Sequence, residues 1–95
     1  MIENSFRIEA ENQDLGIIQV PYNGKVSIHS DKVITVKVTA SCPCINTISK
    51  LVIGNETNLY YTIKTKDERV GYTKKSLYLY DLNDNFLKRI EINYG

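Results

Sequence analysis

Apolar and polar residues alternate along most of this chain. Ile34, Val36 and Val38 alternate with polar residues, and the same period of two recurs at 57–66 and 86–94. Side chains on one face of a β-strand recur at every second position, so each run provides one face for a core and one for solvent. No stretch of about a dozen residues shows the period of about 3.6 that marks an amphipathic helix. The pattern therefore predicts an all-β protein.

The sequence predicts strands at 5–10, 15–21, 25–29, 33–41, 48–53, 57–66, 73–82 and 86–94. Residues that favour turns separate these strands. Asn23-Gly24 predicts the tight turn of a hairpin, and Ser30-Asp31-Lys32 is expected to close the next hairpin. Later turns are expected at Gly54-Asn55-Glu56, Asp67–Gly71 and Asn83-Asp84-Asn85. Short strands at intervals of about ten residues are typical of a β-sandwich.

The apolar faces of these strands supply the expected core. Its members are Phe6, Ile8, Ile17, Val26, Ile28, Ile34, Val36, Val38, Leu51, Ile53, Leu59, Tyr61, Ile63, Leu77, Leu79, Ile90 and Ile92. The chain has 95 residues, close to the ~100 of an immunoglobulin-type sandwich. We therefore expect one domain over residues 1–95.

Charge and hydropathy argue against several classes of partner. The net charge is +1 and acidic residues are mixed among the basic ones, so no basic block indicates a nucleic-acid surface. No apolar run approaches the ~20 residues of a membrane helix. The N-terminus lacks the basic and apolar regions of a signal peptide. We expect no nucleic-acid partner, no membrane insertion, and a whole small gene product without a leader.

A short cysteine motif, Ser41-Cys42-Pro43-Cys44, ends the strand at 33–41, and Gly54-Asn55-Glu56 and Arg69-Val70-Gly71 follow it. With these motifs and two closing strands, the chain from Val38 to Tyr94 resembles bacterial immunoglobulin-like domains related to the ASH and major-sperm-protein families. That family usually has Gly between the cysteines, where this chain has Pro43. The resemblance implies an immunoglobulin-like sandwich of seven to eight antiparallel strands.

The resemblance also implies an exported, structural or adhesive protein with no catalytic site. We expect no cofactor. The composition is rich in Asn, Ile, Lys, Thr and Tyr, which is typical of an AT-rich genome. A single leaderless domain of this kind resembles bacteriophage capsid auxiliary, or decoration, proteins. We therefore expect a virion protein, assembled in the host cytoplasm, that binds capsid subunits or other virion proteins and can form a homo-oligomer on their lattice.

Two other function classes are considered. The first is a periplasmic or cell-envelope adhesion domain of a bacterium, expressed without its leader. The second is an enzyme or redox protein that uses the two cysteines, which the lack of any further catalytic constellation disfavours.

Two cysteines and one histidine limit the chemistry of the chain. Cys42 and Cys44 are half of a four-ligand zinc site, and His29 would still leave one ligand missing. The two sulfurs share a strand face and could bond, but the closed loop is tiny and Pro43 stiffens it. We expect Cys42 and Cys44 to be free structural thiols that pack at a corner of the sandwich.

Other polar residues have ordinary explanations. Asp81-x-Asn83-Asp84-Asn85 offers oxygens at the spacing of a calcium loop but lacks its Gly and closing Glu, so turn chemistry is favoured. His29 is expected to be a surface residue. Asn55-Glu56-Thr57 matches a glycosylation sequon, which matters only in a secretory host.

Seven tyrosines are the most informative surface feature. Tyr78 and Tyr80 share a strand face opposite to Leu77 and Leu79, so a core position for the leucines places both tyrosines outside. Tyrosine is enriched in protein interfaces, although half-buried strands also favour it. We predict a protein interface made by Tyr78, Tyr80, Leu82 and Tyr72.

Overall fold

The computed structural model describes residues 6–67, 69 and 71–95. These residues form nine strands and no helix, which confirms the all-β prediction. The strands are β1 (Ile8–Ala10), β2 (Gln13–Asp14), β3 (Tyr22–Ser30), β4 (Ile34–Ala40), β5 (Ile45–Thr47), β6 (Lys50–Ile53), β7 (Thr57–Ile63), β8 (Thr73–Tyr80) and β9 (Phe86–Tyr94). Their number exceeds the expected seven to eight.

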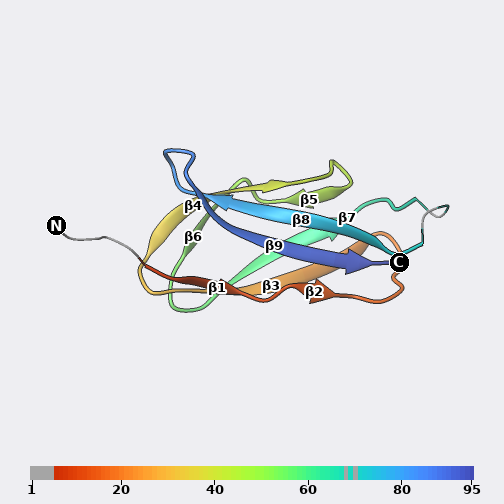
Figure 1. The fold of residues 1–95 in the computed structure, drawn as a ribbon, viewed down its shortest axis with the longest axis horizontal. Helices are drawn as coiled ribbons and strands as arrows, with labels where there is room; N and C mark the ends of the chain where they lie inside the picture. Colours follow the sequence, from red (N-terminus) through yellow and green to blue (C-terminus); the bar gives the residue numbers. More distant parts are fainter. Residues whose placement is uncertain (1–5, 68, 70) are drawn as a thin grey trace.

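The strands form two sheets in a sandwich-like arrangement (Figure 1). One sheet has four strands in the order β1-β3-β7-β5, and the other has five in the order β2-β9-β8-β4-β6. Neighbouring strands are antiparallel except β2 and β9, which run parallel with Gln13 beside Ile92. The prediction of antiparallel strands is wrong for this pair, because the N-terminal segment leaves β3 after β1 and joins the other sheet.

The core lies between the two sheets and comes from alternate positions of the long strands. Its buried apolar members are Ile18, Val26, Ile28, Val36, Val38, Ile45, Ile53, Leu59, Tyr61, Ile63, Leu77, Leu79, Ile90, Ile92 and Tyr94. The period-two pattern located most of this set. Phe6, Ile8, Ile34 and Leu51 are only partly buried. Ile18, Ile45 and Tyr94 were missing from the predicted core.

The predicted hairpin turn at Asn23-Gly24 is wrong, because both residues lie inside β3. Asn23 pairs with Thr62 and Gly24 with Tyr61 along the antiparallel β3–β7 ladder. Gly24 is suited to this place because the Tyr61 ring packs where a Cβ on residue 24 would lie. The glycine thus permits a close approach of side chain to backbone rather than a reversal of the chain.

The segments at Ser30-Asp31-Lys32 and Gly54-Asn55-Glu56 do reverse the chain, but they close no hairpin. Each links a strand of one sheet to a strand of the other, β3 to β4 and β6 to β7. The predicted turn at Asp67–Gly71 includes residues 68 and 70, which lie outside the described residues, as does the start of the predicted strand at 5–10.

Two predicted strands also differ from the structure. Residues 15–21 form no strand, and Ile17 is 88% exposed while its neighbour Ile18 is buried, so the core prediction for Ile17 is wrong. The segment contains a cis peptide bond between Val20 and Pro21. The predicted strand at 48–53 is confirmed only over β6, and it is preceded by β5, a short strand of the other sheet that was not predicted.

Candidate functional site

The outer face of the five-stranded sheet carries the predicted interface tyrosines. Leu77 and Leu79 are fully buried in the core, while Tyr78 and Tyr80 are partly exposed on the opposite side of β8. The predicted face assignment is therefore correct. Leu82 follows β8 in the turn toward β9, and its side chain is 54% exposed.

The aromatic rings on this face form a cluster. The ring centroids of Tyr78 and Tyr80 are 6.5 Å apart, and those of Tyr80 and Phe86 are 6.0 Å apart in an edge-to-face arrangement. Both spacings lie in the range of favourable aromatic pairs. Phe86 is 57% exposed, so the cluster presents an aromatic surface at the end of the sheet.

Sequence reasoning did not find Phe86. Simple alternation puts Phe86 on the same face as the core residue Ile90, but the β8–β9 ladder has an irregularity at Leu79/Tyr80. Lys88 pairs with Leu79 and Phe86 with Tyr80, so Leu87 is the extra residue of a bulge. An extra residue moves the preceding side chain to the other face of a sheet. No signal in the sequence marks this bulge.

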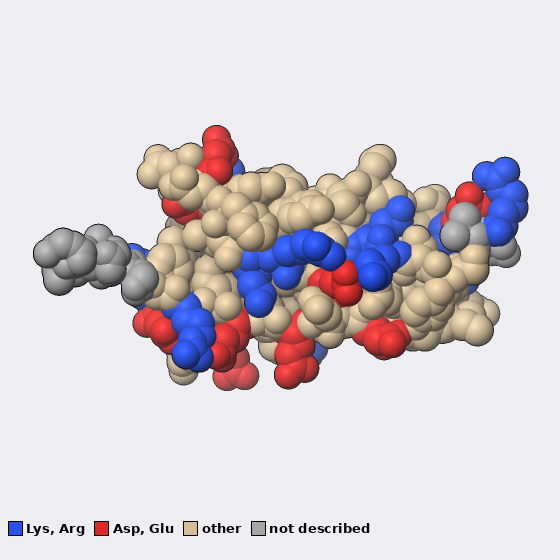
Figure 2. Space-filling view, viewed as in Figure 1, with Lys and Arg blue, Asp and Glu red and all other residues tan. Residues whose placement is uncertain are grey.

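Basic side chains surround the aromatic cluster. Lys37 of β4 lies beside Tyr80, and Arg89 of β9 lies beside Tyr78. Lys50 of β6 lies beside Lys37. Lys74 is four positions before Tyr78 in β8 and therefore lies on the same face of that strand. Figure 2 shows Lys and Arg side chains in a band across the middle of the face on which β8 and β9 lie. We name Lys37, Lys50, Lys74, Tyr78, Tyr80, Phe86 and Arg89 the basic-aromatic face.

Two carboxylates lie among these cations. Lys37 Nζ is 2.5 Å from Asp84 Oδ1. Glu91 Oε2 is 2.8 Å from Arg89 Nη2 and 3.8 Å from Lys74 Nζ. Exposed pairs of this kind contribute little to stability, so their main effect is to orient the side chains of the face.

The structure places Tyr72 apart from the other predicted interface residues. It precedes β8, and Tyr78 lies six positions further along, which corresponds to roughly 20 Å of extended chain. Its hydroxyl accepts a hydrogen bond from the Gly16 N–H at 3.0 Å and donates one to the Asp14 carboxylate. The bond to Asp14 raises the pKa of Tyr72. Tyr72 therefore fastens the 14–16 segment to the end of the sheet.

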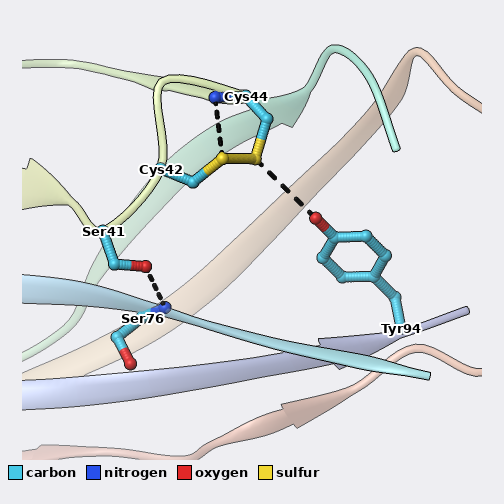
Figure 3. The surroundings of a disulfide bond; sticks show 5 residues. All are labelled: Ser41, Cys42, Cys44, Ser76 and Tyr94. Atoms are coloured by element: carbon cyan, nitrogen blue, oxygen red, sulfur yellow. Dashed lines mark hydrogen bonds between the residues drawn. A yellow bond between two sulfur atoms is a disulfide. The ribbon is translucent and has the colours of Figure 1, made fainter. Parts of the chain in front are cut away.

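The cysteine motif differs from its expected state. Cys42 and Cys44 form a disulfide, so the prediction of free thiols is wrong (Figure 3). The Cys44 N–H donates to Cys42 Sγ at 3.1 Å, and the Tyr94 hydroxyl lies 3.9 Å from Cys44 Sγ. The loop after β4 brings the two sulfurs together despite Pro43. Burial raises the pKa of Tyr94.

A pocket of about 600 Å³ opens beside this disulfide. Its walls include the disulfide, Tyr72, Tyr94, Lys66 and Lys75. Lys66 Nζ donates to the carbonyls of Ile18 and Gly95 at 2.5 and 3.0 Å, so its ammonium group is engaged in holding the chain. The volume is that of a small-molecule site, but the described walls hold no set of catalytic groups in contact with one another.

The remaining candidate groups take structural roles. Asp81 Oδ1 accepts the N–H groups of Asn83 and Asn85 at 2.8 and 2.9 Å, which supports the turn chemistry expected there. The hydrogen bonds from Asn85 contribute most to lowering the pKa of Asp81, and the bond from Asn83 adds to this effect. His29 Nδ1 lies 2.5 Å from the Asn55 carbonyl oxygen at the surface. Among the described residues, no group of three or more His, Cys, Asp or Glu is placed to hold a metal ion.

Comparisons with known proteins add a likeness of fold. No protein-family model matches the chain, and no curated protein matches it at a significant level. The structure is similar to that of a GH5 xyloglucanase from Bacteroides ovatus in complex with a XXXG heptasaccharide, with a TM-score of 0.64 at 10% sequence identity. The match covers 96% of this chain and 19% of the enzyme's chain. At this identity the likeness concerns the fold alone. No described helix could span a membrane.

Proposed function

We propose that this chain is a non-enzymatic binding module of the immunoglobulin-like class that attaches to other proteins through the outer face of its five-stranded sheet. The observation that carries the proposal is the cluster of Tyr78, Tyr80 and Phe86, which exposes aromatic surface on the outside of the sheet. Aromatic residues give large contact area at low entropic cost and dominate the energetics of interfaces.

The sheet topology supports the immunoglobulin-like part of the proposal. In that fold, four strands in the order A-B-E-D pack on a second sheet that contains C, F and G. The order β1-β3-β7-β5 corresponds to the first sheet, and β4, β8 and β9 take the places of C, F and G. β6 and β2 extend the two edges of the second sheet.

The narrower form of the proposal is a bacteriophage capsid auxiliary protein. Such a protein acts passively, and many weak contacts add by multivalency on a repeated lattice. An aromatic cluster on one side of an elongated body of 52 × 22 × 19 Å suits attachment to a subunit surface. The disulfide is compatible with a particle that is exposed to an oxidising medium after release.

The alternative is a periplasmic or cell-envelope adhesion domain, and the disulfide is the observation that favours it. Disulfides form readily in the periplasm and outside the cell but rarely in the cytoplasm, where a virion is assembled. The same binding face would then contact another envelope protein.

The two forms are separated by proteomics of purified virions and of envelope fractions from the source culture. High copy number in virions supports the capsid form, and enrichment in the envelope supports the alternative. Binding of the isolated protein to the enriched fraction is then compared with that of Tyr78→Ser/Tyr80→Ser. Equal binding by a correctly folded double variant would contradict the proposed face.

A further inference from the structure

We propose that the partner bound by the basic-aromatic face is an acidic protein surface, with carboxylates that surround an apolar centre. The inference rests on the proposed function, since it names the chemistry of the partner of that same face. It follows from the register of four strands and from the charges that the register brings together.

One row of the sheet shows the arrangement. Lys50, Lys37, Tyr80 and Phe86 lie side by side on β6, β4, β8 and β9. Residues directly opposite each other on neighbouring strands share a face and lie in contact distance. Two cations therefore stand next to two aromatic rings, and the following row adds Arg89 beside Tyr78.

Within this row, the pair of Lys37 and Lys50 gives the clearest indication of the charge of the partner. Like charges directly opposite on neighbouring strands are unfavourable, yet the strands place these two lysines as register partners. Asp84 pairs with Lys37, while Lys50 has no ion pair with any described residue. A carboxylate from a partner that lies over this row would relieve the repulsion.

The face as a whole has an excess of positive charge. Its four cations, Lys37, Lys50, Lys74 and Arg89, meet three carboxylates: those of Asp84 and Glu91, and that of Asp81, which lies near enough to Lys37 to interact with it electrostatically. The Glu91 side chain is only 20% exposed and is shared by Lys74 and Arg89, so it cannot balance both. Complementary charge guides encounter and orientation at an interface.

A nucleic acid would also offer negative charge and flat rings for stacking. The carboxylates argue against it, because Glu91 contacts both Lys74 and Arg89 and Asp84 contacts Lys37, so they would repel a continuous phosphate backbone that follows these cations. A protein surface presents separate carboxylates that can be placed opposite the cations and away from these acids. The observations therefore favour an acidic protein.

The test uses the full chain and short soluble peptides in which Glu is interspersed with Leu and Tyr. Matched peptides carry Gln or Lys in place of Glu, and an oligonucleotide of thymidine serves as the nucleic-acid probe. Binding is followed by amide chemical shifts in NMR spectra, which report weak affinity and its location together. We expect the Glu peptide to shift amides on β4, β8 and β9 and to bind about tenfold more tightly than the Gln peptide. The preference should decline as ionic strength rises.

Charge reversal provides the matched variants. Lys37→Glu/Arg89→Glu should bind the Lys peptide in preference to the Glu peptide, and Lys37→Gln/Arg89→Gln replaces it if the reversed chain fails to fold. Lys25→Glu/Lys64→Glu changes as many charges at exposed positions, one in β3 of the four-stranded sheet and one directly after β7, and should leave the Glu preference intact.

Equal affinity for Glu and Gln peptides on this face would overturn the acidic partner and leave the protein-binding proposal standing. Stronger binding of the oligonucleotide through the same amides would overturn it in favour of nucleic acid. An absence of shifts with every probe would also overturn it. The proposed function is tested by a separate experiment, the binding of Tyr78→Ser/Tyr80→Ser to the virion or envelope fraction. Binding equal to that of the wild type would contradict the proposed function.

Discussion

The two outer faces of the sandwich are built from similar antiparallel strands but carry different chemistry. On the four-stranded sheet, Ser27 Oγ donates to Asn58 Oδ1 at 3.2 Å, and Thr62 Oγ1 donates to Asn23 Oδ1 at 2.8 Å. Each pair joins β3 to β7 across the ladder, so these polar groups bond with one another. Exceptions are Tyr60, whose side chain is 63% exposed, and its register partner Lys25, which is also exposed.

The outer face of the five-stranded sheet carries partly exposed aromatic rings and more cations than it pairs. Tyr78, Tyr80 and Phe86 pack against one another, and Lys50 has no carboxylate partner among the described residues, although Lys37, Lys74 and Arg89 have one. A face whose side chains are already paired contributes to the fold, whereas a face with spare contact area and charge can bind. We therefore expect substitutions on the five-stranded sheet to change binding, and substitutions at the β3–β7 ladder to change stability.

The largest expected effect comes from Tyr78→Ser/Tyr80→Ser. Loss of aromatic residues at an interface typically weakens binding by about 2 kcal/mol or more at each main contact, so affinity for the virion or envelope fraction should fall at least ~30-fold. The circular dichroism spectrum should be unchanged. Tyr60→Ser is the matched control on the other face and should bind normally. Unfolding of the double variant would show that the rings support the core.

Gly24→Ala should lower stability without changing binding. A Cβ at residue 24 would overlap the Tyr61 ring, which is 2% exposed and would have to shift within the packed core. Overpacking of this kind costs about 1–3 kcal/mol of unfolding free energy, measurable by urea denaturation. Gly71→Ala, where no neighbouring atom lies within 4 Å of the added Cβ, is the control. Equal stability of both variants would mean that the β3–β7 ladder is looser than the structure shows.

Tyr61→Phe should be neutral or stabilising by about 1 kcal/mol at pH 7. The buried Tyr61 hydroxyl has no hydrogen-bond partner among the described residues. Burial and then the neighbouring Tyr22 raise the pKa of Tyr61 to about 12. The unfolded chain therefore loses this proton first, and stability should fall as pH rises from about 10 to about 12. Thermal melts should show a shallower fall in Tyr61→Phe, and an identical alkaline slope would contradict the assignment.

Asp81→Ala should have the smallest effect and should act on the turn beside the aromatic cluster. The hydrogen bonds from Asn85 and Asn83 lower the pKa of Asp81, so they stabilise the fold above its unfolded value of about 3.9 and are lost as pH falls through the folded value. The variant should be slightly less stable than the wild type at pH 7, and the difference should vanish at strongly acidic pH. Asp81→Asn retains an acceptor and should lie between the two. A difference that persists in acid would exclude the carboxylate as its cause.

The sequence predicted the parts of this fold that follow from local alternation. β4, β7, β8 and β9 and the outward position of Tyr78 and Tyr80 all follow from a period of two, because one buried face imposes that period on each strand. The disulfide was not predicted. The path of the loop after β4 brings the two sulfurs together, and the spacing of two cysteines does not reveal that path.

Features that depend on distant partners could not be predicted. Asn23-Gly24 has the composition of a hairpin turn, but pairing of β3 with β7 kept the chain extended. Phe86 joined the aromatic cluster only because of a bulge that pairs it with Tyr80. The cationic neighbours of the tyrosines come from β4, β6 and β9, so their meeting depends on strand order, which alternation does not specify.

The parallel pairing of β2 with β9 has a mechanical consequence. The segment after β1 is tied to the last strand by hydrogen bonds from Leu15 N to Asn93 O and from Gly95 N to Gly16 O, each 2.9 Å long, in addition to the β2–β9 ladder. Figure 1 shows β1 and the C-terminal end of β9 toward opposite ends of the long axis. A tensile load applied along that axis would pull β2 and β9 in opposite directions and strain these bonds together in shear, rather than opening them one after another. A protein held at one end of this axis and pulled at the other would therefore resist extension through the hydrogen bonds of β2, its shortest strand.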